Sequence, residues 1–162
     1  MWLTPQVVGT PPFQYSWLLD PPAEGSCTDC AELLLRPLDT TLVRLTVTDA
    51  SGCTATARTV VPVEKDYRVF VPNAFSPNDD GFNDRFLPFG KQGTEVVRLQ
   101  VFDRWGELVY DVREVPAGDY PSGWDGTFHG RPMPAGVYVW RALFRFLDGY
   151  EVEQSGDLLL LR

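Results

Sequence analysis

The loop within residues 69–86, VFVPNAFSPNDDGFNDRF, holds the side chains best suited to bind a ligand. Asn78, Asp80 and Asp84 offer side-chain oxygens, and Phe82 can add a carbonyl oxygen. Hard cations such as calcium take roughly six to eight oxygen ligands, which short acidic loops with a central glycine supply at alternate positions. The loop therefore predicts a calcium site.

A second interpretation of the same loop needs no metal. The distal acidic ligand and flanking helices of an EF-hand are missing from the pattern. Asn and Asp side chains in turns also accept hydrogen bonds from nearby backbone amides. The loop would then be a cluster of Asx-turns that holds its own backbone, and the sequence leaves both interpretations open.

The three cysteines, Cys27, Cys30 and Cys53, all lie in the first half of the chain. A zinc site of three cysteines and His129 would need ligands from both halves, which disfavours it. In an oxidising compartment we expect one disulfide, from Cys53 to Cys27 or Cys30, with one thiol left over. Three free thiols are the alternative.

The sequence contains no recognisable catalytic pattern. The single His129 has no Cys or Ser partner in a known order, and no G-x-S-x-G, H-E-x-x-H or phosphate-binding loop occurs. Asp79 and Asp80 could act as an acid/base pair, but adjacent side chains in a turn diverge. We predict that the protein is not an enzyme.

Composition predicts an all-β protein. The chain has 162 residues, 44% of them hydrophobic, which is enough to build packed cores. Its 14 prolines and 14 glycines are spread between short apolar runs, and no sustained helical period occurs. We expect two Ig-like antiparallel β-sandwich modules in tandem, at residues 1–66 and 67–162, with the first module incomplete.

Charge and hydropathy exclude several classes of partner. The net charge of −8 divides evenly between the two segments, and no basic tract could neutralise phosphates. Nucleic acid and anionic lipid surfaces are therefore disfavoured as partners. No apolar run is long enough for a transmembrane helix, and the first residues lack the pattern of a signal peptide. We expect a monomer whose signal peptide, if it is exported, is not in this chain.

The first segment carries the pattern of paired strands. Residues 9–17, GTPPFQYSW, alternate aromatic and polar side chains, and residues 45–61, LTVTDASGCTATARTVV, form a hairpin pattern. These stretches resemble the later strands of the PKD-type, Ig-like repeats of bacterial surface proteins. The resemblance begins partway through such a repeat, which implies a partial module with an unpaired sheet edge.

The second segment contains four motifs in a specific order. These motifs are NAFSPNDDGFNDRF, LQVFDRWGELVYD, GWDGTFHGRPMPAGVYVWRALF and the final GDLLLLR. In the second motif's strand, Val97, Leu99 and Val101 are expected on one face. Residues 67–162 resemble the gliding motility-associated C-terminal domain, the type B sorting domain of type IX secretion cargo in Bacteroidota.

The resemblance implies a function in export. Such domains direct large surface or secreted proteins, often adhesins, through the type IX machinery of the outer membrane after periplasmic passage. The expected location is the cell surface or the exterior, and the expected partner is that machinery. The common loop has Gly where this chain has Asp79. The alternatives are a calcium-stabilised adhesin stalk and a carbohydrate-binding module.

The last strand is the best candidate for recognition by the machinery. A partner could read it by strand addition or by gripping its carboxylate, or it could simply complete the core. Trp105 and Trp124 are interpreted as structural aromatics rather than as recognition residues. The predicted recognition residues are Gly156, Asp157, Leu158, Leu159, Leu160, Leu161 and Arg162.

Overall fold

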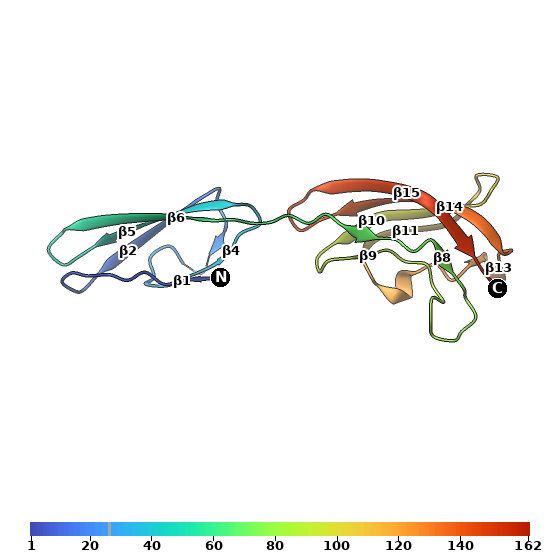
Figure 1. The fold of residues 1–162 in the computed structure, drawn as a ribbon, viewed down its shortest axis with the longest axis horizontal. Helices are drawn as coiled ribbons and strands as arrows, with labels where there is room; N and C mark the ends of the chain where they lie inside the picture. Colours follow the sequence, from blue (N-terminus) through green and yellow to red (C-terminus); the bar gives the residue numbers. More distant parts are fainter. Residues whose placement is uncertain (26) are drawn as a thin grey trace. The chain divides into compact units, whose positions relative to one another are not determined.

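The computed structural model describes residues 1–25 and 27–162 and is built almost wholly from β-strands (Figure 1). Nearly all strand pairs are antiparallel, which confirms the all-β, Ig-like prediction. The chain divides into two units, Met1–Lys65 and Asp66–Arg162. Within the described ranges, no helix is long and apolar enough to cross a membrane.

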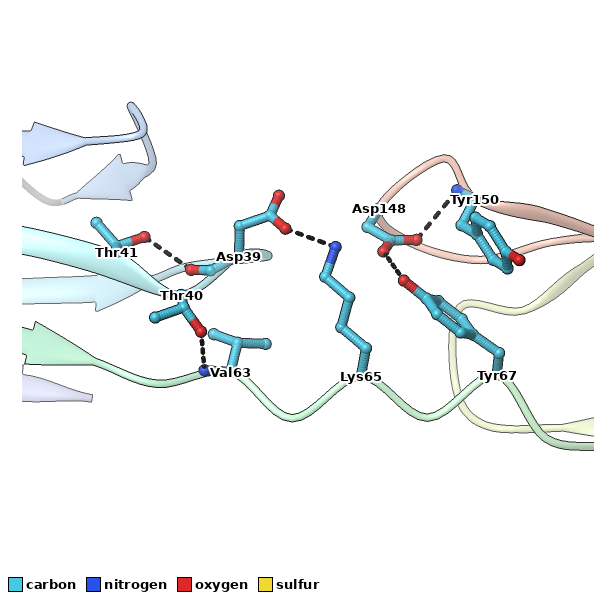
Figure 2. A network of polar contacts seen from close by, with 8 residues as sticks. All are labelled: Asp39, Thr40, Thr41, Val63, Lys65, Tyr67, Asp148 and Tyr150. Carbon is cyan, nitrogen blue, oxygen red and sulfur yellow. Dashed lines mark hydrogen bonds and ion pairs between the residues drawn. The ribbon is translucent and has the colours of Figure 1, made fainter.

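The residues on either side of the boundary between the two units form polar contacts within their own unit, as Figure 2 shows. Within the first unit, the Lys65 ammonium pairs with the Asp39 carboxylate. Within the second unit, the Tyr67 hydroxyl donates a hydrogen bond of 2.7 Å to Asp148. Asp66 also belongs to the second unit.

The described residues of the first unit form two three-stranded sheets. Strands β2 (Gln14–Asp20), β5 (Thr41–Thr48) and β6 (Thr54–Val61) form one sheet in the order β2-β5-β6. Strands β1 (Trp2–Leu3), β4 (Leu33–Arg36) and β3 (Glu24–Gly25) form the other, in the order β1-β4-β3. In the described part of the unit, β6 pairs only with β5, and its side chains are exposed up to Val60. The core of the first unit consists of Trp17, Leu33, Leu35, Val43, Leu45, Val47 and Val61.

The disulfide joins Cys27 to Cys30, so the expected bond to Cys53 is wrong. The Trp17 indole N–H donates to the Cys30 carbonyl at 2.8 Å, which holds the cysteine loop beside the middle of β2. Cys53 follows the turn after β5, whose last residue, Thr48, pairs with the first residue of β2. It is therefore several strand residues away from the other two cysteines, and its thiol is free and exposed.

The main sheet of the second unit has the order β11-β10-β14-β15-β8. Strands β10 (Glu95–Phe102), β11 (Leu108–Pro116), β14 (Gly136–Arg145) and β15 (Glu151–Leu160) are long and antiparallel. The two-residue β8 (Ala74–Phe75) pairs in parallel with the end of β15 (Figure 1). The sheet thus places the last strand between a long neighbour and a very short one.

Short strands cover the other side of the core. These are β7 (Val69–Phe70) with β9 (Phe89–Gly90), and β12 (Thr127–Phe128) with β13 (Arg131–Pro132). A 3-10 turn, η1, spans Tyr120–Ser122. Trp124 lies in the centre of this core, with its ring 5.3 Å from that of Phe75 and 5.2 Å from that of Tyr138.

The core face of β10 differs from the prediction at one position. Leu99 and Val101 are buried as expected, but Val96 takes the place of Val97. The pairing of β10 with β14 shifts register between Val96 and Arg98. A β-bulge of this kind inserts one residue and moves the preceding side chains to the opposite face.

Candidate functional site

The acidic loop of the sequence analysis is organised around the buried Asp84 carboxylate. Asp84 is only 8% exposed, and one of its oxygens accepts the backbone N–H groups of Asn78 at 3.1 Å and Asp79 at 2.7 Å. Its other oxygen accepts the N–H of Gly81 at 2.8 Å. These three donors form a cradle for a carboxylate.

The remaining oxygens of the loop are used in a similar way. The Asp80 carboxylate accepts the Phe82 backbone N–H at 2.8 Å and the Asn78 side-chain amide at 3.0 Å. The Asn78 side-chain oxygen accepts the Asp80 N–H at 3.2 Å. This is the Asx-turn arrangement, and the described residues contain no group of three or more His, Cys, Asp or Glu placed to hold a metal. The side-chain oxygens of Asn78, Asp80 and Asp84 all accept N–H groups of the loop, and calcium binding stays a prediction.

The backbone conformation at Asp79 is one that favours glycine. Asp79 has a φ of 60°, in the left-handed region that glycine adopts without steric cost. Asp and Asn tolerate this conformation better than other residues do. The Ser76 N–H closes the loop by donating to the Asn83 carbonyl at 2.8 Å, which fixes the end of β8.

The structure corrects part of the recognition prediction for the last strand. The Leu159 N–H donates to the Asn73 carbonyl at 2.8 Å, and the Leu161 N–H donates to the Phe75 carbonyl at 2.9 Å. Both edges of the strand are therefore occupied at its end, by β14 and by β8. A partner strand cannot add at these residues, so the prediction of strand addition there is wrong.

Four of the seven predicted recognition residues have structural roles. Leu158 and Leu160 are fully buried in the core. A Cβ at Gly156 would meet the Trp140 ring at 3.1 Å, so glycine lets that ring pack beneath the strand. The Arg162 guanidinium donates to the backbone carbonyls of Met133 and Gly126, at 3.0 and 3.1 Å.

The other three residues, Asp157, Leu159 and Leu161, are exposed on the outer face of the sheet. Val137 and Val139 of β14 are exposed beside them, and they pair with Leu159 and Asp157 respectively. We call Val137, Val139, Leu159 and Leu161 the outer apolar patch. Single exposed apolar residues are ordinary, but clusters on one face are typical of interaction sites.

The rest of the outer face is covered by ion pairs. Arg98 forms two hydrogen bonds of 2.9 Å with Asp111, and Arg141 pairs with Glu153 at 2.7 and 2.8 Å. Hydrogen bonds from these arginines lower the pKa of the Asp111 and Glu153 carboxyl groups. The outer face is thus divided into a charged part and the apolar patch.

The two tryptophans have different environments. Trp124 is buried and its indole N–H donates to the Thr127 carbonyl at 2.8 Å, as expected of a structural aromatic. Trp105 is 79% exposed at the turn between β10 and β11, with the Arg104 guanidinium 4.9 Å from the centre of its ring. The structural interpretation of Trp105 is therefore wrong, because its ring buries little area.

Comparison with known families assigns the second unit. Residues 69–159 match the CHU_C type IX secretion signal domain. The chain belongs to this family. The family is a sorting signal of a non-catalytic type, which implies interaction with the type IX machinery and export to the cell surface or beyond. The four ordered motifs of the sequence analysis lie largely within the matched range.

Solved structures give more distant similarities. Dimeric latent PorU from Porphyromonas gingivalis matches at 18% identity and a TM-score of 0.34, over 91% of this chain and 16% of that one. SGBP-B of the Bacteroides ovatus mixed-linkage glucan utilization locus, in complex with a heptasaccharide, matches at 17% identity and a TM-score of 0.34. That match covers 100% of this chain and 40% of the other. No curated protein matches the chain.

Proposed function

We propose that residues 67–162 form a non-catalytic C-terminal sorting and anchoring module that directs a large surface or secreted protein through the type IX secretion system. The observation that supports it is the family match over residues 69–159, which covers most of the second unit. Residues 1–66 act as a partial PKD/Ig-like stalk in front of this module. The cargo reaches the cell surface or the exterior after periplasmic passage.

The outer apolar patch is the surface that the machinery contacts in this proposal. Its four side chains lie around the end of β15, which the buried Leu158 and Leu160 fix in the core. A partner that covers exposed apolar side chains gains roughly 25 cal/mol per Å² of area removed from water. The neighbouring ion pairs would form the polar rim of this contact.

The export role can be tested with the whole chain of 162 residues. We would place it behind a signal peptide and a fluorescent reporter and express the fusion in a type IX-competent host and in a strain without the export channel. Fluorescence should reach the surface or the medium only in the competent host. Reporter that stays in the periplasm of that host would overturn the proposed function.

Deleting residues 156–162 would be an ambiguous test of recognition, because it removes the buried Leu158 and Leu160 and should destabilise the domain strongly. The double variant L159S/L161S changes only exposed side chains of the patch. L147S is the matched control, since Leu147 is exposed in the turn between β14 and β15. Export should fall in the double variant and persist in the control. Equal export of both would remove the patch from the proposal.

A further inference from the structure

Most of the outward edge of β15 has no partner strand among the described residues. The N–H groups of Leu159 and Leu161 point toward β8. Backbone groups of alternate strand residues point to the same edge, and the β14–β15 register is continuous, so those of Glu153, Ser155 and Asp157 point the same way. In the described part of the chain, the pairing with β8 covers only Leu159 and Leu160 of this strand.

A groove of about 670 Å³ lies beside β15 at Gln154. On one side it is lined by Gln154 of β15, and on the other by β7, β9 and the residues around them. Phe70 and Phe89, which line it, are 66% and 44% exposed, and their rings lie 6.3 Å apart. Tyr67, drawn in Figure 2, also lines the groove and packs against Tyr150, with 4.3 Å between ring centres.

The edge carries charged side chains at Glu151, Glu153 and Asp157 but lacks other devices that protect exposed strands. Natural proteins block such edges with charged side chains, proline, bulges or a covering loop. Residues 151–157 read EVEQSGD, without proline or lysine, and their pairing with β14 has no bulge. Ser155 and Gly156 are small, so another backbone can approach closely at the middle of the open stretch.

We propose that an extended segment of the type IX export machinery adds as a strand to the edge of β15 at residues 153–157. Its backbone pairs with the outward N–H and carbonyl groups of Glu153 and Ser155, and an apolar side chain enters the groove beside Phe70 and Phe89. This inference rests on the proposed export function and uses an edge distinct from the outer apolar patch.

Charge repulsion disfavours a second copy of this chain as the added strand. Two copies of β15 paired antiparallel around Ser155 would set Glu153 of each directly opposite Asp157 of the other. Like charges directly opposite in a sheet are destabilising. Asp157 is exposed and has no ion pair among the described residues, so it is available to a Lys or Arg of the added strand. The occupant is therefore an extended segment with a basic residue opposite Asp157.

The test compares S155P with S155A in the whole chain fused to the export reporter. Proline removes the outward N–H and adds bulk at the edge, yet it spares the bonds to β14 because the Ser155 N–H points away from that strand. The loss of one intermolecular hydrogen bond, together with the steric clash between the proline ring and the added strand, should lower export about tenfold. S155A keeps the N–H and should be exported like the wild type.

Two further measurements keep the outcome clear. The melting temperature of purified S155P should equal that of S155A, and wild-type export in the same host shows that the proposed function holds. If wild type and S155P are exported equally, strand addition is overturned while the sorting function stands. If wild type is not exported, the proposed function itself fails.

A photo-crosslinking residue at Ser155 tests the same contact with no change in the β14 ladder. We expect an adduct with an extended segment of an outer-membrane type IX component. The matched control carries the same residue at the exposed Arg113 of β11, the strand at the other end of the sheet. Equal adducts at both positions, or an adduct with a second copy of this chain at Ser155, would overturn the inference.

Discussion

Replacing Asp84 by alanine should destabilise the second unit strongly. The Asp84 carboxylate accepts three backbone N–H groups within the loop between β8 and Phe86, and it is buried. D84A leaves these donors without their acceptor. The same loop fixes β8, and the carbonyls of Asn73 and of Phe75 in β8 accept the N–H groups of Leu159 and Leu161, so the damage should extend to the end of β15.

The size of the effect follows from the number of bonds. A hydrogen bond to a charged group contributes about 1.5–3 kcal/mol, and water that replaces the Asp84 carboxylate in the variant reduces the loss to about 1 kcal/mol per bond. The three bonds together give a loss of about 3 kcal/mol. For a unit of this size, each kcal/mol of lost stability lowers the melting temperature by about 4–8 °C, so we expect a fall of about 12–24 °C.

The measurement is scanning calorimetry of the whole chain in the presence of a chelator. D79N is the matched control, because it removes one carboxylate charge from the same loop while its left-handed backbone conformation also suits Asn. D79N should melt within about 3 °C of the wild type. Amide exchange should show loss of protection at Leu159 and Leu161 in D84A only.

Two results would contradict this reasoning. If D84A melts within about 3 °C of wild type, the three bonds contribute little and the loop is not a structural element. If the wild type itself loses stability on chelation and regains it with added calcium, a bound cation holds the loop, as mass action requires. The second result would establish the calcium prediction and replace the Asx-turn explanation.

Two further predictions concern the tryptophans and the ion pairs of the outer face. W124A should lower the free energy of unfolding by about 3–5 kcal/mol, because it empties the centre of the core, whereas W105A should change it by less than about 0.5 kcal/mol in urea unfolding. The hydrogen bonds from Arg98 lower the folded-state pKa of Asp111, so this carboxylate stabilises the fold above its unfolded pKa of about 3.9 and loses that contribution as pH falls. The difference in melting temperature between wild type and D111N should therefore shrink between about pH 6 and pH 3, and a constant difference would refute the linkage.

Local patterns in the sequence predicted the strands and indicated the family. Alternating apolar residues and scattered prolines predicted strands, and the order of four motifs indicated the family that residues 69–159 match. In the Asp-rich loop, both the calcium and the Asx-turn interpretations used the same oxygens. Residue types alone could not separate them, because the difference lies in whether N–H groups point at those oxygens.

The sequence-based predictions were wrong at positions whose structure depends on contacts with distant parts of the chain. Val97 was expected on the same face as Leu99 and Val101, but the bulge against β14 places Val96 there. Cys53 was expected in the disulfide, but strand pairing places it several residues from the Cys27–Cys30 loop. Register and bulges depend on a partner strand distant in sequence, so no local pattern could have revealed them.

The sequence by itself determined the fold class and the family, because these depend on the period of apolar residues and on motif order. Only the tertiary structure decided which face of β15 is exposed and which part of its edge is free. Leu159 looks like an available edge residue in the sequence, yet β8 from the start of the unit pairs with it. The open edge at residues 153–157 exists because β8 is only two residues long and pairs only at the end of the strand.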